Sequence, residues 1–285
     1  MSVTERLDLV IRLKVPVGGV EERRVRLLEG PAGWGEWSPL PSWSEAEVAA
    51  AQAAAEEAAS RDFPGARRAL VAVNAMVPRV EPDLAARLAV ASGCGTVKVK
   101  VGDAQGEARV AAVRAAVGPN VRIRLDANGA WDPDTALAEL RRLAVHDLEL
   151  VEDPVATLGE LAWLRRRTPV PVAAEMSVRT VADARRLREL DAAAAVVLKP
   201  QRIGGVRAAL AAATEAGAPV IASSALETSV GLAAVLALAA ALPESPYAHG
   251  CGTALLLASD VTRDPLVPVQ GMLRPRRVAP DLVGT

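Results

Sequence analysis

The segment T-V-K-V-K-V-G (residues 96–102) places two lysines, Lys98 and Lys100, between valines that suit a buried strand. Side chains two residues apart in a strand point to the same side, so both lysines share one face. Burying an ammonium group without a partner is costly. The two lysines therefore require either a solvent-exposed face or a charged cavity, and the rest of the chain decides between these.

Seven further short segments of β-type sequence end in a polar residue or glycine and are followed by a stretch rich in Ala, Leu and Arg. The eight segments end at Asn74, Lys100, Asp126, Glu152, Glu175, Lys199, Ser223 and Gly250. Successive ends lie 23 to 27 residues apart, which is the length of one strand, one helix and two short loops. The stretch 134–144 has apolar residues at helical spacing, as such units require. This repeat predicts an α/β fold of the (β/α)8-barrel type.

Polar residues fall at the same phase of this repeat. Right-handed crossover connections place the C-terminal ends of all parallel strands on one rim of a barrel. That rim is where barrel enzymes carry their active sites. We therefore expect Lys100, Asp126, Glu152, Glu175 and Lys199 to converge on one cavity.

Residues 1–66 do not follow the repeat and predict a small α+β capping domain. R-L-D-L-V-I-R-L-K-V and R-R-V-R-L-L-E-G resemble antiparallel strands, and 30–40 resembles a turn-rich loop. A helix is expected over 44–58, beginning with a capping serine. We expect residues 67–259 to form the catalytic barrel, and the proline-rich tail 260–285 to pack back on the capping domain.

Composition narrows the classes of function. The net charge of −1 provides no basic face for nucleic acid and no polybasic membrane anchor, although a small anionic dicarboxylate substrate remains possible. The longest apolar run, 230–242, is too short to span a bilayer, and the N-terminus lacks a signal-peptide pattern. Cys94 and Cys251 are expected to be reduced, buried thiols, although a disulfide remains open. These features favour a cytoplasmic protein of undetermined oligomeric state.

Three carboxylates at three successive strand ends are suited to a hard divalent cation such as Mg²⁺. A metal-bound carboxylate acidifies its α-proton, and a lysine of lowered pKa can remove that proton. Each carboxylate alone could equally cap a loop or a helix, and Asp153 is expected to be a turn residue before Pro154. The hypothesis therefore depends on the combination of acids and lysines in phase with the repeat.

Four motifs carry a resemblance to a known family: V-K-V-K (97–100), L-D-A-N-G-A-W (125–131), V-E-D-P (151–154) and V-L-K-P (197–200). In this order and spacing they resemble the enolase superfamily, in its muconate-lactonizing-type branch. G-W-G-E-W-S-P, V-N-A-M-V-P, S-S-A-L-E-T-S-V-G and G-C-G-T-A-L-L-L-A-S-D-V-T more narrowly resemble the o-succinylbenzoate synthases of menaquinone biosynthesis. The resemblance covers the whole chain.

The resemblance implies catalytic roles for three lysines. Lys100 would act as the general base and then as the acid that helps the hydroxide leave as water. Lys199 would stabilise the enolate by its charge. Lys98 would adjust Lys100, since two neighbouring ammonium groups depress each other's pKa.

The resemblance also implies ligands for metal and substrate. Asp126, Glu152 and Glu175 would bind Mg²⁺, for which Mn²⁺ could substitute. Four residues would orient or bind the substrate, in particular its succinyl carboxylate: Ser223, Ser224, Gly250 and Asn128.

Two positions depart from the family pattern. The third ligand segment normally reads A-A-D-E-S but here reads A-A-E-M-S, with Glu175 and Met176. The longer glutamate is expected to bind the metal still, with altered affinity. The usual A-C-G-L-G-T becomes A-H-G-C-G-T, which introduces His249 and Cys251. His249 would either contact an anionic substrate or, as the more frequent case, pack behind the rim.

The leading hypothesis is Mg²⁺-dependent dehydration of 2-succinyl-6-hydroxy-2,4-cyclohexadiene-1-carboxylate to 2-succinylbenzoate. A racemase of N-succinylamino acids or an epimerase of dipeptides would use the same metal and both lysines. The absence of D-x-D at the last strand end argues against a dipeptide epimerase. A non-catalytic barrel is the remaining alternative, supported only by the substitution at Glu175.

Overall fold

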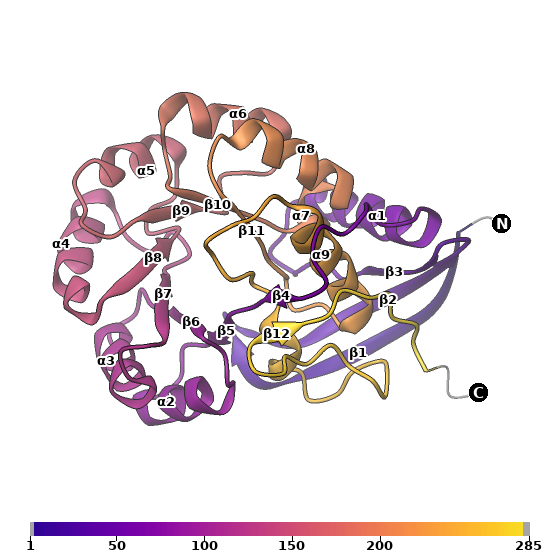
Figure 1. The fold of residues 1–285 in the computed structure, drawn as a ribbon, viewed down its shortest axis with the longest axis horizontal. Helices are drawn as coiled ribbons and strands as arrows, with labels where there is room; N and C mark the ends of the chain where they lie inside the picture. Colours follow the sequence, from indigo (N-terminus) through magenta and orange to yellow (C-terminus); the bar gives the residue numbers. More distant parts are fainter. Residues whose placement is uncertain (1–2, 282–285) are drawn as a thin grey trace.

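The computed structural model describes residues 3–281, which form an antiparallel N-terminal unit beside a ring of parallel strands surrounded by helices (Figure 1). In the N-terminal unit, β1 (Thr4–Val17), β2 (Val20–Gly30) and β3 (Gly33–Trp37) form one sheet, with α1 (Glu45–Ser60) against it. The expected loop at 30–40 is therefore wrong in its middle, because 33–37 pairs with β2 as a third strand.

Local sequence explains the shape of this unit. Gly18 and Gly19 both have positive φ (57° and 81°), which a two-residue turn between β1 and β2 requires. The helix predicted over 44–58 is confirmed as α1, and Ser44 and Glu47 form a reciprocal capping box. Gly35 permits the close approach of α1 to β3, since an ideal Cβ there would lie 2.0 Å from the carbonyl oxygen of Ala55.

The predicted fold class, an α/β fold of the (β/α)8-barrel type, is confirmed. Seven parallel strands pair in chain order: β5 (Ala75–Val77), β6 (Thr96–Lys100), β7 (Arg122–Asp126), β8 (Leu148–Glu152), β9 (Val172–Ala174), β10 (Ala195–Leu198) and β11 (Val220–Ala222). The eighth predicted segment contributes only isolated parallel bridges, from His249 to Val73 and from Gly250 to Ser223. These bridges connect the two edges of the curled sheet.

Helices surround the ring (Figure 1). In chain order they are α2 (Pro82–Ala91), α3 (Gly106–Val117), α4 (Pro133–Leu143), α5 (Leu158–Arg165), α6 (Val181–Leu190), α7 (Pro200–Ile203), α8 (Val206–Ala216) and α9 (Ser229–Ala241), with the 3-10 turns η1 (Ala144–His146) and η2 (Gly252–Leu256). Asp132, Thr157 and Thr180 cap α4, α5 and α6 with their side chains. These caps fix where each loop on the functional rim ends.

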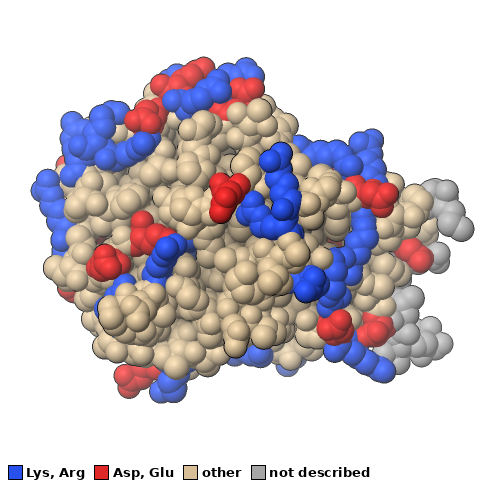
Figure 2. All heavy atoms as spheres, viewed as in Figure 1, with Lys and Arg blue, Asp and Glu red and all other residues tan. Residues whose placement is uncertain are grey.

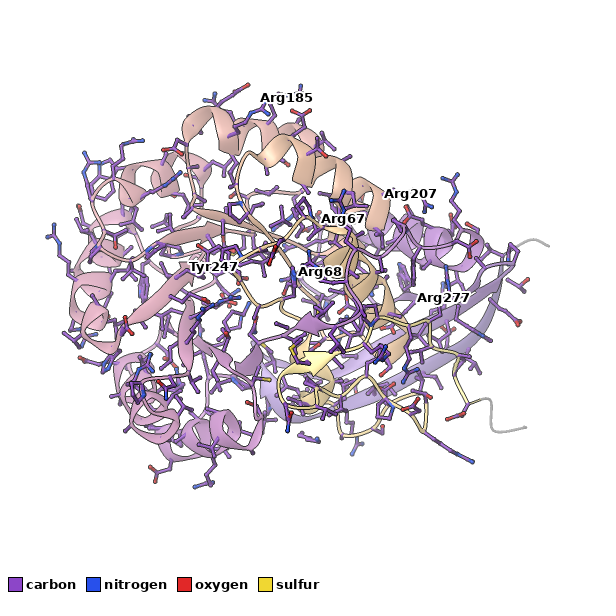
Figure 3. The ribbon with its side chains drawn as sticks, viewed as in Figure 1. Arg67, Arg68, Arg185, Arg207, Tyr247 and Arg277 are labelled. Carbon is purple, nitrogen blue, oxygen red and sulfur yellow. The ribbon has the colours of Figure 1, made fainter. Side chains whose placement is uncertain are left out.

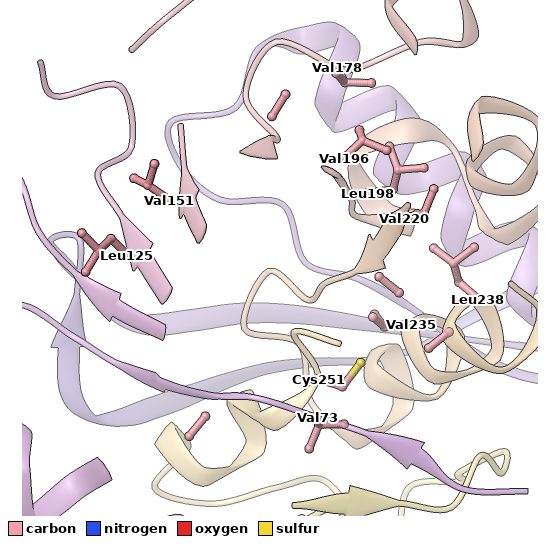
Figure 4. Packing of buried hydrophobic residues seen from close by; sticks show 14 of the residues in the cluster. Val73, Leu125, Val151, Val178, Val196, Leu198, Val220, Val235, Leu238 and Cys251 are labelled. Carbon is pink, nitrogen blue, oxygen red and sulfur yellow. The ribbon is translucent and has the colours of Figure 1, made fainter. Parts of the chain in front are cut away.

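Aliphatic side chains fill the space between sheet and helices. Leu125, Val151, Val196 and Leu198 point from the strands toward the helices, as Figure 4 shows at close range. The apolar run 230–242 forms most of α9, which is buried on nearly all sides. Within residues 3–281, no helix is long and apolar enough to cross a membrane.

The C-terminal tail lies against both parts of the molecule. β12 (Met272–Leu273) pairs antiparallel with β4 (Val71–Ala72). Farther along, the Arg277 guanidinium donates hydrogen bonds to the carbonyl oxygens of Ala58 (2.8 Å) and Arg61 (2.6 Å) near the end of α1 (Figure 3). On the face in Figure 2, acidic and basic side chains are interspersed around the periphery.

Candidate active site

A cavity of about 480 Å³ lies at the C-terminal ends of the barrel strands and reaches up to the N-terminal unit. Strand ends supply its charged and polar wall, which includes Lys98, Lys100, Asp126, Asn128, Glu175, Lys199, Ser223, Ser224 and Gly250. The N-terminal unit contributes Val17, Gly18, Val20, Leu40, Ser42 and Trp43. The cavity thus combines several convergent charged groups with apolar lining residues, as small-molecule sites do.

The two lysines of β6 point into this cavity and contact carboxylates. Lys98 Nζ lies 2.9 Å from Asp126 Oδ2 and 2.8 Å from Glu152 Oε2. Lys100 Nζ donates to Asp126 Oδ2 and to Asn128 Oδ1, both at 2.7 Å. The parallel register, which pairs Lys100 with Asp126 and Asp126 with Glu152, places these three residues on one level of the barrel, and Lys98 reaches them from the level of Arg124.

Burial and charge act differently on the two lysines. Burial lowers the pKa of Lys100, and the neighbouring Lys98 ammonium adds to this effect. Burial alone would also lower the pKa of Lys98, but the carboxylates of Asp126 and Glu152 outweigh it and raise that pKa. The expected mutual depression is therefore wrong for Lys98, because it sits between two acids, whereas the direction expected for Lys100 agrees.

Glu175 lies on the other side of the cavity, directly after β9. Its Oε2 accepts a hydrogen bond from Lys199 Nζ at 2.9 Å, and Arg202 Nη1 lies 2.8 Å from Oε1 and 3.1 Å from Oε2. Burial alone would raise the pKa of Glu175, but Lys199, Arg202 and the nearby Arg179 lower it to about 2. Arg202 in turn donates from Nε to Glu47 of α1 at 2.6 Å. The carboxylate of Glu175 is thus held in its ionised form.

Buried carboxylate oxygens lie close together between the contacts of Lys98 and Lys100 and the contact of Lys199. Glu152, Asp153 and Glu175 each offer a carboxylate oxygen, and these oxygens lie within 4.8 Å of one another. Asp126 is linked to Glu152 through the shared Lys98 ammonium. A donor set made only of carboxylate oxygens, all buried, fits a hard divalent cation.

Asp153 was interpreted from sequence as a turn residue, and its contacts agree with that role. It adopts a positive φ of 43°, and its two oxygens accept the backbone N–H groups of Glu175 and Met176, both at 2.9 Å. Burial raises its pKa well above the ordinary value, with the nearby Glu175 charge adding to the effect. Asp153 thereby fixes the segment that presents Glu175.

The residues expected to bind substrate lie in the same cavity. Ser223 is buried, and Gly250 lies against it so closely that an ideal Cβ at residue 250 would be 2.4 Å from Ser223 Oγ. Ser224 Oγ is 2.6 Å from Thr253 Oγ1. Asn128 reaches the cavity from a left-handed turn (φ 52°) after β7.

His249 lies behind the rim. It is 2% exposed, and its Nδ1 accepts the backbone N–H of Ala222 at 3.0 Å. Burial lowers its pKa to about 4, so it is neutral at pH 7. Cys94 and Cys251 are both free and buried, as expected.

Several cavity residues were not identified from the sequence. Arg202 carries a direct contact to Glu175, and its position three residues after Lys199, on the next helical turn, was the available signal. Trp43 lines the cavity, whereas Trp34 and Trp37 are not among the lining residues. Trp37 instead packs in the N-terminal unit beneath Arg26.

Comparisons with known proteins agree with this arrangement. The family described as "Enolase C-terminal domain-like" matches residues 82–284, and "Enolase N-terminal domain-like" matches residues 9–59. Solved structures with this fold include a dipeptide epimerase from Enterococcus faecalis (TM-score 0.82, 23% identity, 98% of this chain and 97% of that chain). An N-succinyl Arg/Lys racemase from Bacillus cereus has a TM-score of 0.84 at 19% identity, over 96% of this chain and 92% of that chain. Similarity at this identity establishes the fold of an enolase-type barrel.

Relatives found by sequence identity define the family within this fold. The o-succinylbenzoate synthase of Thermobifida fusca is 52% identical over 273 residues, which are 94% of this chain and 86% of that protein. The o-succinylbenzoate synthase of Mycobacterium ulcerans is 44% identical over 98% of this chain and 87% of that protein. The chain belongs to the o-succinylbenzoate synthase family of the enolase superfamily.

Proposed function

We propose that this protein is a Mg²⁺-dependent lyase that dehydrates 2-succinyl-6-hydroxy-2,4-cyclohexadiene-1-carboxylate to 2-succinylbenzoate. The observation that carries the proposal is 52% identity to a named o-succinylbenzoate synthase over 94% of the chain. Three lysines line one cavity with Asp126 and Glu175, and Glu175 belongs to a cluster of buried carboxylates with Glu152 and Asp153; both observations support the proposal. The product is aromatic, so the enzyme mainly needs to stabilise an enolate and to position one base.

Lys100 is the base in this proposal. Its neutral amine removes the proton from the ring carbon that bears the carboxylate, and the electron pair of that C–H bond moves into an enolate. The lowered pKa of Lys100 favours the neutral amine that this step requires. The resulting ammonium then returns its proton to the hydroxyl on the adjacent carbon, which leaves as water while the ring becomes aromatic. Base and acid are one group, so the elimination is syn.

Asp126, Glu152 and Glu175 would hold the magnesium ion, which when bound supplies positive charge for the substrate carboxylate. Lys199, 2.9 Å from Glu175, would add its ammonium charge on the side opposite Lys100. Ser223 would bind the succinyl carboxylate, with Ser224 and the backbone at Gly250 beside it.

The test is product formation from the cyclohexadiene substrate by the protein and by its Lys100→Ala variant, with Mg²⁺ and with chelator. We expect Mg²⁺-dependent succinylbenzoate formation and a loss of about 10³-fold or more in the variant. A folded, Mg²⁺-saturated protein that forms no product would rule out the synthase assignment.

A second candidate is racemisation of N-succinylamino acids, which the presence of both Lys100 and Lys199 in one cavity supports. The same preparations would be incubated with an N-succinylamino acid in deuterated water. Exchange of the α-proton by the wild type, with no dehydration of the cyclohexadiene, would favour the racemase.

A further inference from the structure

The loop between β11 and α9 carries Ser223 and Ser224, and it has a strained backbone. Leu226, which lines the cavity, has a φ of 67°. Residues with a side chain seldom adopt this left-handed region, and they keep it only where surrounding contacts impose it. The contacts that hold this loop therefore also hold the serines that face the cavity.

The backbone N–H groups of Ser223 and Ser224 bond to Leu198 and Gly250 of the barrel, whereas the later part of the loop is held from the N-terminal unit. Arg23 of β2 is 1% exposed, and its guanidinium donates to the carbonyl oxygens of Leu226 (3.4 Å) and Pro39 (3.3 Å). Glu36 of β3 is 2% exposed and reaches the end of the same loop. Two ionisable side chains from one sheet thus meet this loop away from solvent.

Glu36 binds the loop with both carboxylate oxygens. Oε1 accepts the backbone N–H of Thr228 at 3.2 Å, and Oε2 accepts the backbone N–H of Gly231 at 3.0 Å. The hydroxyl groups of Ser38 and Thr228 donate to the same carboxylate. Thr228 is the N-cap residue of α9, so Glu36 satisfies two donors that the helix leaves free at its first turn.

Glycine at position 231 makes the close contact between Glu36 and α9 possible. An ideal Cβ on Gly231 would lie 3.0 Å from Glu36 Cδ and 2.7 Å from Glu227 Cβ, so only glycine permits the close approach. Ser38, whose hydroxyl donates to Glu36, also accepts a hydrogen bond from Gln201 Nε2 at 3.0 Å. Gln201 follows Lys199 by two residues, which extends the network to the other side of the cavity.

We infer that Glu36 is a positioning residue for substrate binding: through Thr228 and Gly231 it fixes the loop that presents Ser223 and Ser224. The inference rests on the proposed function for its kinetic readout. Glu36 lies outside the set of residues that line the cavity and touches no reacting atom. Its effect should therefore fall on substrate affinity and leave the chemical step largely unchanged.

The test compares Glu36→Gln with Asp260→Asn. The glutamine keeps one acceptor oxygen but places an NH₂ group against a backbone N–H, so one hydrogen bond becomes a clash of donors. Asp260 is the matched control, because it also binds the first turn of α9, through Ser229 N at 3.1 Å and Ser229 Oγ at 2.8 Å, and forms no hydrogen bond with residues 223–228.

Two readouts are measured on both variants: KM and kcat for the cyclohexadiene, and hydrogen exchange at the amides of Thr228 and Gly231. We expect Glu36→Gln to raise KM by about tenfold with kcat within about twofold, and to accelerate exchange at both amides. Asp260→Asn should leave KM and both amides near wild type.

An unchanged KM in folded Glu36→Gln would overturn the inference. An equal rise of KM in Asp260→Asn would also overturn it, because general loosening of α9 would then explain the effect. If the wild type makes no succinylbenzoate, the proposed function fails, and slow exchange at both amides in Glu36→Gln would then reject the positioning role independently.

Discussion

Replacing Glu175 by glutamine removes the negative charge on which Lys199 and Arg202 converge. The carboxylate is 2% exposed, with contacts of 2.9 Å to Lys199 and 2.8 Å to Arg202. The glutamine keeps the shape but removes this counter-charge from Lys199 in a buried place, while Arg202 retains its contact with Glu47. Removing one partner of a buried ion pair costs about 3–5 kcal/mol.

The pKa of Glu175 provides a second estimate of the same quantity. Its value of about 2, against an ordinary 4.5, corresponds to roughly 3 kcal/mol of preference for the ionised form in the folded protein. Because this pKa is depressed, the stabilisation is complete above pH 4.5 and is lost as pH falls toward 2. We therefore expect Glu175→Gln to lower the free energy of unfolding by about 3 kcal/mol at pH 7, and by less below pH 4.5.

The assay is urea unfolding in the presence of chelator, so that no metal contributes to the difference. Glu215→Gln is the matched control, since Glu215 contacts Arg185 and Arg188 at the surface and should change stability by less than about 1 kcal/mol. A loss at Glu175 no larger than the loss at Glu215 would refute the reasoning. So would a difference from wild type that stays constant between pH 7 and pH 3.5.

Two further predictions concern stability. Because the pKa of His249 is lowered to about 4 by burial, and then by Arg68 and Arg124, the unfolded chain binds a proton between pH 6.5 and 4 that the folded protein does not. The free energy of unfolding of the wild type should therefore fall by about 3 kcal/mol as pH drops through that window. Urea unfolding at pH 7, 5.5 and 4.5 should show a smaller fall with pH for His249→Asn. An equal fall in both proteins would contradict the assignment. Gly35→Ala should cost about 1–3 kcal/mol in the same assay, since its Cβ would meet backbone at Ala55, whereas Gly65→Ala, with open space around it, should be near neutral.

Local rules were sufficient for most of the architecture. The even spacing of strand ends predicted the parallel ring, and the S-E-A-E start predicted where α1 begins. The third strand of the N-terminal sheet was not predicted, because G-W-G-E-W is short and flanked by turn residues. Its strand form depends on pairing with β2, and a pairing partner is a non-local feature.

The incomplete strand pairing of the eighth barrel segment also depends on a non-local feature. Y-A-H-G has the phase of a strand, yet its only parallel partners in the described part of the chain are single bridges at His249 and Gly250. A strand of regular length in this segment would need neighbouring strands that pair with it beyond Val73 and Ser223. The repeat predicted where the segment lies, but the closure of the ring decided how much of it pairs.

For the candidate site, the sequence by itself determined which groups meet, because a residue at a strand end in phase with the repeat must face the same rim. Lys100, Asp126, Glu152 and Lys199 follow from that rule. Only the tertiary structure decided which contacts support the site. Arg202 bonds to both Glu175 and Glu47, and Glu36 accepts a hydrogen bond from Thr228. The contacts of Arg202 with Glu47 and of Glu36 with Thr228 join residues 155 and 192 positions apart, and electrostatics at such pairs depends on burial and distance, which only the folded chain defines.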